Sequence, residues 1–229
     1  MSSPQYKFRD KLLVAVDCII FGFDGLQIKA LLVERDLEPG KGLNALMGGF
    51  VNSKESVQDA AKRVLNKLTG LTDTYMEQLA CFGDEQRDPG GRVISIAYFA
   101  LIKIDDYSSD LMAEHSSQWF PLDALPTLVF DHTDMIKLAR QRLQEKVSTH
   151  PSGFTLLPQK FTLQQLQALY EAIYETSFDK RNFTRKMLSL NILRKLAEKE
   201  TSSSRKGAFL FEFDKKKYKI LEKEGLKFL

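Results

Sequence analysis

The chain has only two cysteines in 229 residues and no long apolar run. No segment approaches the roughly 20 apolar residues that span a bilayer, and the first residues lack the apolar stretch of a signal peptide. We therefore expect a cytoplasmic protein with no membrane partner. Cys18 and Cys81 lack the spacing of a metal site, and Cys18 lies in an apolar run typical of a buried, reduced thiol.

Charged residues are unevenly divided along the chain. Residues 1–150 contain 17 Lys and Arg against 21 Asp and Glu, whereas residues 151–229 contain 16 against 9. A weakly acidic part is thus joined to a basic part, and the length suits two domains. The basic part favours contact with a polyanion, and a merely solvated basic face is the alternative.

The front part of the chain predicts strands on both sides of one helix. Apolar and β-branched residues indicate strands at 12–21, 26–34, 75–82 and 93–104. Apolar residues at helical spacing indicate a helix at 56–69. Strands that flank a helix in this way predict a mixed α/β sandwich.

This helix and the turn before it carry a spacing that resembles the Nudix box, G-x5-E-x7-R-E-U-x-E-E-x-G-U, where U is bulky and apolar. The residues in register are Gly49, Glu55, Arg63, Leu65, Gly70 and Leu71. The three glutamates that complete the box are replaced by Val64, Lys67 and Leu68. Mg²⁺ is held by carboxylates and substrate phosphates, and these three side chains supply no such oxygen. We therefore predict a Nudix fold without pyrophosphohydrolase activity, catalytic residues, metal or cofactor.

A polar loop at 83–92 separates two of the predicted strands. Its turn residues and mixed charges favour contact with a polar ligand, and a glycine pair before the helix allows close approach of a ligand or of the helix itself. The alternative is a solvated hairpin loop closed by an Arg87–Asp88 or an Arg92–Glu85 pair. The candidate effector-binding residues are Asp17, Gly48, Gly49, Glu85, Arg87, Asp88 and Arg92.

A histidine, His132, stands at the start of a helix predicted at about 133–147. No serine or cysteine nucleophile accompanies it, so we expect a local hydrogen bond at the helix start in place of a catalytic role. The helix is predicted to bridge two domains. Residues 148–158, with two prolines and a glycine, predict a connecting loop.

The basic part predicts a helix, a turn, a basic helix and a hairpin, in the order of a winged helix. A capped helix begins after Thr162, a basic helix is predicted at 180–191, strands at 193–200 and 208–214, and a closing helix at 215–225. The N-terminal residues of a recognition helix meet DNA base edges, and a basic hairpin tip suits a DNA-binding wing. A module that binds an acidic protein is the alternative. The candidate DNA-binding residues are Lys180, Arg181, Asn182, Thr184, Arg185, Lys186, Ser203, Ser204, Arg205 and Lys206.

Together these features resemble the Nudix-related transcriptional regulators, over nearly the whole chain. The segments that carry the resemblance, besides the altered box, are Arg87-Asp88-Pro89, Phe130-Asp131-His132 and Asn182-Phe183-x-Arg185-Lys186. The wing keeps the family pattern except at Gly207, where the family often has proline.

The resemblance implies an α+β protein, with an N-terminal Nudix-like α/β/α sandwich followed by a C-terminal winged helix-turn-helix. Residues 1–130 would sense an effector, residues 131–150 would form the bridging helix, and residues 151–229 would bind DNA. The resemblance also implies a homodimer on a palindromic double-stranded DNA operator.

The effector is expected to be a small molecule. The ligands of the regulators that the chain resembles differ by branch, and the resemblance suggests the arabinose-regulator branch, hence a small sugar such as L-arabinose and a repressor of sugar catabolism genes. The lost metal site also weakens the case for a diphosphate, because no Mg²⁺ would neutralise it. The alternatives are a regulator of NAD metabolism that responds to ADP-ribose and a Mg²⁺-dependent Nudix hydrolase of nucleoside diphosphates.

Overall fold

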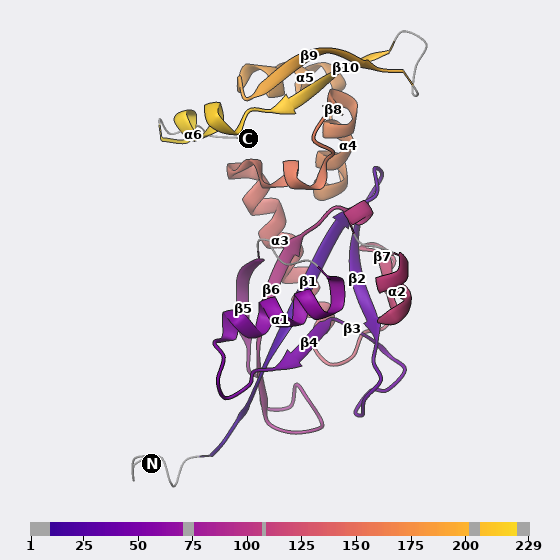
Figure 1. The fold of residues 1–229 in the computed structure, drawn as a ribbon, viewed down its shortest axis with the longest axis vertical. Coiled ribbons are helices and arrows are strands. Elements are labelled where there is room, and N and C mark those ends of the chain that lie inside the picture. The colour runs from indigo at the N-terminus through magenta and orange to yellow at the C-terminus, as the bar shows by residue number, and fades with distance from the viewer. Residues whose placement is uncertain (1–9, 71–75, 107–108, 202–206, 224–229) are drawn as a thin grey trace.

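The structure consists of two parts that stack along its long axis (Figure 1). This computed structural model describes residues 10–70, 76–106, 109–201 and 207–223. A seven-stranded mixed sheet forms the larger part, and a three-stranded sheet with three α-helices forms the described portion of the smaller part. The helix α3 (His132–Thr149) runs from one part towards the other.

Strand β1 (Leu13–Phe23) is the central strand of the large sheet. It pairs in parallel with β6 (Val93–Leu101) and antiparallel with β2 (Ile28–Glu34) and β4 (Met47–Phe50). The order is β3-β2-β1-β6-β5, with β4 paired to β1 and β7 paired to β2. The remaining strands are β3 (Asn44–Ala45), β5 (Met76–Phe82) and β7 (Ser117–Pro121).

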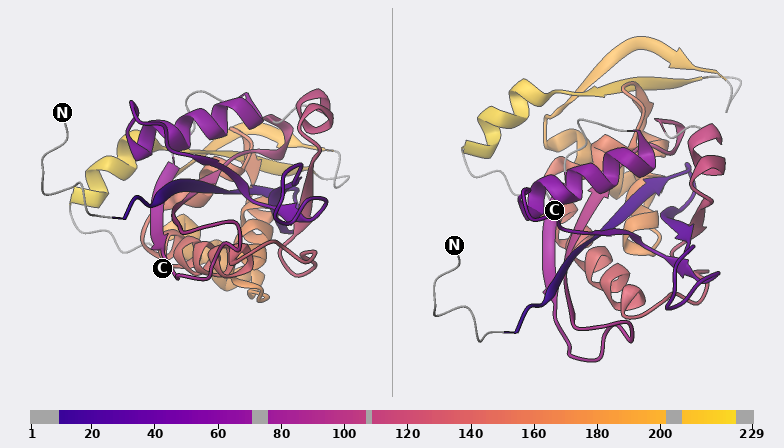
Figure 2. Two further views of the ribbon diagram at one scale, coloured as in Figure 1. Left: turned by 90° about the horizontal axis from the view of Figure 1, so that it is seen from below. Right: turned by 60° about the horizontal axis from the view of Figure 1, so that its bottom comes forward.

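Helices cover both faces of this sheet. Successive side chains of a strand point to opposite faces, so one strand can pack against helices on both sides. Val16 and Cys18 of β1 pack with α1 (Val57–Thr69), whereas Ile19 and Phe21 pack with α3. Figure 2 shows α1 on one side of the sheet and the helices of the later chain on the other. The predicted α/β/α sandwich is confirmed, and the nearly continuous apolar sequence of β1 follows from its two-sided burial.

Local signals set the ends of α1. The Ser56 Oγ accepts the Asp59 N–H at 3.1 Å, and Gly70 ends the helix with a φ of 71°.

Beyond β6, which stops earlier than predicted, the chain forms a 3-10 turn, η2 (Ile104–Asp106), and a short helix, α2 (Ser109–Glu114).

The smaller part has the order of elements of a winged helix. Thr162 and Gln165 form a reciprocal capping box, and the Asp179 Oδ1 accepts the Asn182 N–H at 2.9 Å. Both predicted helix starts are therefore confirmed. The elements are β8 (Phe161–Thr162), α4 (Leu163–Tyr174), α5 (Lys180–Ser189), β9 (Leu193–Glu200), β10 (Ala208–Phe213) and α6 (Lys215–Lys223).

The prediction of a connecting loop at 148–158 is wrong. This segment contains a 3-10 helix, η3 (Pro151–Leu156), in which Phe154 and Leu156 are buried. The Phe154 ring stacks on Phe213 of β10 with centroids 4.6 Å apart. Burial of its apolar side chains thus favours a packed 3-10 helix although the segment contains turn residues. One hydrophobic cluster extends from β1 through α3 and η3 to α4 and α5. Within the described ranges, no helix has the length and apolar character needed to cross a bilayer.

Candidate effector pocket and nucleic-acid interface

A pocket of about 500 Å³ lies beside the central strands of the large sheet. Residues of β1, β2, β4 and α1 line it, together with residues around 87–88, 114–116 and 130–132. We refer to it as the effector pocket. Five of the predicted effector-binding residues line it, namely Asp17, Gly48, Gly49, Arg87 and Asp88. The other two, Glu85 and Arg92, lie outside its lining.

The glycine pair permits two close approaches. A Cβ on Gly48 would lie 2.3 Å from the Asp17 Oδ1, and a Cβ on Gly49 would lie 3.0 Å from the Val64 Cγ2. Gly48 therefore makes room for the Asp17 carboxylate, and Gly49 lets α1 pack against β4. The expectation of close helix approach is confirmed at Gly49.

A buried charge network includes two of the lining residues, Asp17 and Arg87. The Arg87 guanidinium donates to both carboxylate oxygens of Asp131, from Nε at 2.8 Å and from Nη2 at 2.6 Å. Its Nη2 also lies 3.6 Å from the Asp17 Oδ2, which accepts the Ser95 hydroxyl at 2.5 Å. The Arg87 side chain is 3% exposed. Its charge is thus compensated by two carboxylates of the protein, and neighbouring Asp131 and Asp17 help to raise its pKa against the effect of burial.

The pairs expected for a solvated loop do not form. Arg87 pairs with Asp131, not with Asp88. The Arg92 guanidinium donates to the backbone carbonyl oxygens of Gly83 and Asp84, each at 3.0 Å, so it closes the loop without Glu85.

The expectation of a local hydrogen bond for His132 is wrong. Its Nδ1 accepts the N–H of Leu46, 86 positions earlier in the chain, at 3.0 Å. Burial lowers the pKa of this imidazole, although the nearby Asp17 opposes the shift. The neutral ring therefore carries its proton on Nε2, which lies 3.7 Å from the Asp17 Oδ1. His132 and the neighbouring Asp131 are site residues that sequence reasoning did not select, although the Phe130-Asp131-His132 segment had been noted.

The donor set around the altered box does not suit Mg²⁺. Val64 is 3% exposed in the core between α1 and the sheet, whereas Lys67 lines the effector pocket. The remaining carboxylate, Glu55, pairs with Arg63 at 2.6 Å and accepts the Asn52 N–H at 2.7 Å. The hydrogen bonds from Arg63 and Asn52 lower the pKa of Glu55 to about 2. Two of the glutamate positions of the box therefore hold an apolar and a cationic side chain, and the remaining carboxylate is already paired with Arg63. The Leu68 side chain and Leu71 lie outside the described part of the chain.

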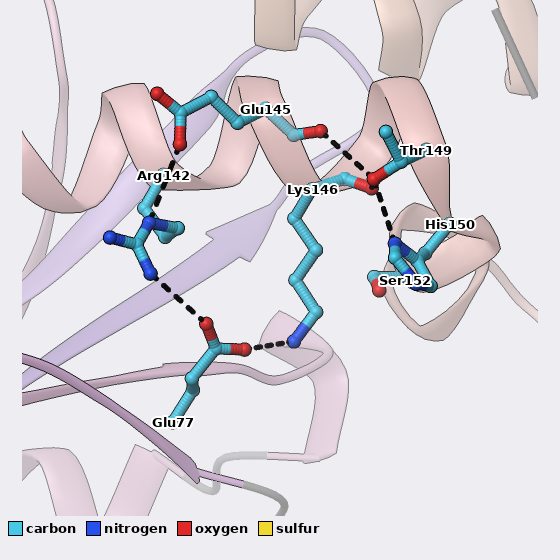
Figure 3. A pocket seen from close by; sticks show the side chains of 7 residues that line it. All are labelled: Glu77, Arg142, Glu145, Lys146, Thr149, His150 and Ser152. Carbon is cyan, nitrogen blue, oxygen red and sulfur yellow. Dashed lines mark hydrogen bonds and ion pairs between the residues drawn. The ribbon is translucent and has the colours of Figure 1, made fainter.

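A more open hollow of about 660 Å³ lies where β5 faces α3 (Figure 3). Its charged side chains are paired with one another. Glu77 of β5 forms an ion pair with Lys146 and lies 3.7 Å from Arg142, and Arg142 in turn lies 3.4 Å from Glu145. These pairs attach the edge strand to the bridging helix.

The candidate nucleic-acid interface is the exposed side of α5. Phe183 and Met187 are buried beneath it. The Arg185 Nη2 donates to the Asn182 Oδ1 at 2.8 Å, which orders two candidate DNA contacts before any ligand is bound. Thr184 is half-buried, and the exposed candidates are Lys180, Arg181, Asn182, Arg185 and Lys186.

The hairpin adds basic residues that sequence reasoning did not select. Lys195 and Lys199 of β9 lie over the half-exposed ring of Phe209, with Nζ 3.6 Å and 4.7 Å from its centroid. The predicted contacts at the tip, Ser203, Ser204, Arg205 and Lys206, lie outside the described residues.

Comparison with known families divides the chain in the same way. The NUDIX domain matches residues 11–139, and the NrtR DNA-binding winged helix domain matches residues 153–213.

Similar proteins include a transcriptional repressor and a regulator whose structures contain DNA or ADP ribose. The ADPR responsive transcriptional repressor NtrR of Acinetobacter baylyi is 34% identical over 197 residues, which cover 84% of this chain and 79% of the relative. The structure of Shewanella oneidensis NrtR complexed with a 27mer DNA has a TM-score of 0.77 and 30% identity, over 87% of this chain and 93% of that chain. The NUDIX domain of the same protein complexed with ADP ribose has a TM-score of 0.50 and 31% identity, over 62% of this chain and 99% of that chain.

These relatives overturn one prediction. The small-sugar effector and the role as a repressor of sugar catabolism genes are wrong, because the similar repressor is named for its response to ADP-ribose and the similar NUDIX domain was crystallised with ADP ribose. Because the match covers 79% of the relative at 34% identity, the chain belongs to the family of Nudix-related regulators that join a NUDIX domain to an NrtR DNA-binding winged helix domain.

Proposed function

We propose that the protein is a transcriptional repressor of NAD metabolism genes that binds operator DNA through α5 and the wing and binds ADP-ribose in the effector pocket. The observation that carries this proposal is the position of α3. Its first residue, His132, lines the pocket, and its later turns contact α4 of the winged helix. A ligand in the pocket therefore meets the same rigid element that holds the DNA-binding part.

The contacts between α3 and α4 are specific polar ones. The Gln144 Nε2 donates to the Ile173 carbonyl oxygen at 2.8 Å, and the Tyr174 hydroxyl donates to the Gln144 carbonyl oxygen at 3.0 Å. Arg140 forms an ion pair with Glu175 at the end of α4. In this proposal residues 1–130 sense the effector, residues 131–150 transmit its binding, and residues 151–229 bind DNA.

The DNA contacts follow from charge and geometry. Lys180, Arg181, Arg185 and Lys186 would neutralise phosphates, while Arg185 and Asn182 have the donors and acceptors that read guanine and adenine edges. The hairpin tip at 203–206 would contact the backbone on the other side of the groove. A homodimer would place two such helices on the two halves of a palindromic operator, and the protein would act in the cytoplasm.

In this proposal the Nudix domain binds ADP-ribose without hydrolysing it. The supporting observation is chemical, because Val64 and Lys67 stand where the box has glutamates and Glu55 is paired with Arg63. An assay of ADP-ribose turnover with millimolar Mg²⁺ tests this point, and sustained release of AMP would show an enzyme instead.

The experiment that tests the whole proposal is a DNA-binding measurement with and without effector. Genomic fragments selected by the full-length protein supply the operator, which is then compared with a scrambled duplex by fluorescence anisotropy over a range of salt. We expect tight binding to the operator and weak binding to the scrambled duplex. We also expect the affinity for the operator to change when ADP-ribose is added. Equal binding to both duplexes, or no response to ADP-ribose, would contradict it.

A further inference from the structure

The effector pocket has an unfavourable charge balance for a diphosphate. Its lining contains five carboxylates and three cationic side chains. A diphosphate carries about two negative charges at neutral pH, so like-charge repulsion opposes its entry unless a cation meets it. In metal-dependent sites Mg²⁺ supplies that charge, but the altered box has Val64 and Lys67 in place of glutamates, and the described residues contain no cluster of three or more candidate metal ligands.

Two of the three cationic side chains already have partners. Arg87 is held by the carboxylates of Asp131 and Asp17 and is 3% exposed. The Arg35 Nε donates to the Pro39 carbonyl oxygen at 2.7 Å, and its guanidinium lies over the Phe130 ring at 5.2 Å from the centroid. The charge of Arg87 is thus compensated by carboxylates, whereas Arg35 is held in place by a neutral carbonyl and a ring and keeps its positive charge.

The third cationic side chain is Lys67, on the last turns of α1. It is exposed, and it forms no ion pair with any residue that the structure describes. Val64, one turn earlier, packs against Gly49 of β4, so the side of α1 that carries Lys67 borders the glycine pair that lines the pocket. Lys67 also occupies a position at which the Nudix box has a glutamate.

We propose that the Lys67 ammonium takes the place of the metal, pairing directly with the diphosphate of ADP-ribose so that binding is independent of Mg²⁺. This inference rests on the proposed function and deepens it. The substitution of glutamate by lysine reverses the charge at this position, so one change removes a metal ligand and adds a phosphate ligand. A lysine ammonium offers three donors to phosphate oxygens, and such charge-assisted hydrogen bonds are among the stronger ones.

Calorimetric titration of the full-length protein with ADP-ribose tests this inference. Lys67→Gln removes the charge and keeps the length of the side chain approximately. Lys67→Glu restores the residue type of the box. Lys62→Gln is the matched control, because Lys62 is exposed on the same helix and does not line the pocket. Each protein is titrated with EDTA and again with Mg²⁺, and circular dichroism checks that each variant is folded.

We expect wild type to bind equally well in EDTA and in Mg²⁺. Lys67→Gln should bind roughly tenfold or more weakly in both conditions, as befits the loss of a hydrogen bond to a charged group. Lys67→Glu should bind still more weakly in EDTA and regain affinity with Mg²⁺, while Lys62→Gln should match wild type. Adenosine, which lacks the diphosphate, should bind wild type and Lys67→Gln alike.

Two results would overturn the inference while leaving the proposed function intact. One is that Lys67→Gln binds ADP-ribose as tightly as wild type, and the other is that EDTA abolishes binding by wild type. If wild type binds no ADP-ribose in either condition, the proposed function fails and this inference fails with it.

Discussion

The carboxylate of Asp131 accepts two hydrogen bonds from the guanidinium of Arg87, a residue 44 positions earlier in the chain. Arg87 lies in the loop between β5 and β6, and Asp131 directly precedes α3. The Asp131 side chain makes no capping hydrogen bond to α3. The pair therefore joins a wall of the effector pocket to the start of the bridging helix.

Replacement of Asp131 by Ala should destabilise the protein substantially. It would leave the buried Arg87 with the more distant Asp17, at 3.6 Å, as its remaining ion-pair partner among the described residues. We expect a loss of about 2 kcal/mol in the free energy of unfolding, below the range for fully buried pairs because Asp131 is 20% exposed. Urea denaturation measures this loss.

The exposed pair between Lys137 and Asp134 is the matched control for this prediction. Both side chains are more than two-thirds exposed, and they lie on the same helix. Asp134→Ala should cost less than about 0.5 kcal/mol. If the two alanine variants were equally stable, the Arg87–Asp131 pair would have no special role in the fold.

The free energy of unfolding should fall as the pH is lowered below about 6.5. In this range His132 gains a proton in the unfolded chain but stays neutral in the folded protein. Burial holds the folded pKa of His132 below its ordinary value of 6.5, so the unfolded chain binds this proton more readily than the folded protein. The stabilisation is complete above about pH 6.5 and is lost as the pH falls towards the folded pKa. The charged groups that face the ring are Asp17, Asp131, Arg87 and Arg35.

Urea denaturation of wild type and His132→Asn between about pH 5 and about pH 7.5 measures this effect. Asparagine can still accept a hydrogen bond from the Leu46 N–H but does not titrate. We expect the variant to show a shallower dependence of stability on pH, whatever its absolute stability. Parallel curves for the two proteins would mean that His132 does not contribute.

Local signals were sufficient to predict most elements of the fold. The capping residues Ser56, Thr162 and Asp179 each lie within three positions of the N–H that they accept, so a linear pattern contains the whole interaction. The nearly continuous apolar sequence of β1 and the helical spacing of apolar residues in α1 indicated their burial in the same way. By contrast, 148–158 was predicted as a loop because its turn residues are local and the core contacts of Phe154 are not.

The candidate site was predictable as a region but not as a set of partners. Arg87 had a nearer carboxylate in Asp88, and His132 had nearer N–H groups at the helix start, so sequence proximity favoured the wrong pairs. The two partners are brought close only by the packing of α3 against the sheet. Lys67 was interpreted as a lost ligand, because its position in the pocket is visible only in three dimensions.

Replacement of both Arg181 and Arg185 by Ala should weaken operator binding and reduce its dependence on salt. Each phosphate contact that is lost should make the slope of log K against log salt shallower by roughly 0.9. If Arg185 also reads a base, the preference for operator over scrambled duplex should narrow as well. Anisotropy titrations at several salt concentrations measure both quantities.

Lys62→Ala provides the control for the DNA-binding prediction, because it removes an exposed cation from α1 and leaves the winged helix unchanged. Its salt dependence should equal that of wild type. Normal operator binding by the double alanine variant would show that α5 is not the recognition helix.

The hydrogen bonds between Gln144 and α4 should matter for the response to effector more than for either binding event. Coupling between two ligands amounts to about 1 to 3 kcal/mol in typical regulators, and it requires an element that both sites bias. Tyr174→Phe removes only the hydroxyl that donates to the Gln144 carbonyl oxygen, and Gln144→Ala removes the amide that donates to Ile173.

We expect both variants to bind ADP-ribose and operator separately with affinities near those of wild type. The change in operator affinity on addition of ADP-ribose should shrink in each, and most in Gln144→Ala, because that variant loses the direct bond to the backbone of α4. Anisotropy titrations at zero and saturating ADP-ribose give the coupling. If coupling were unchanged in both variants, the signal would have to pass between the two parts by another route, such as the ion pair of Arg140 with Glu175.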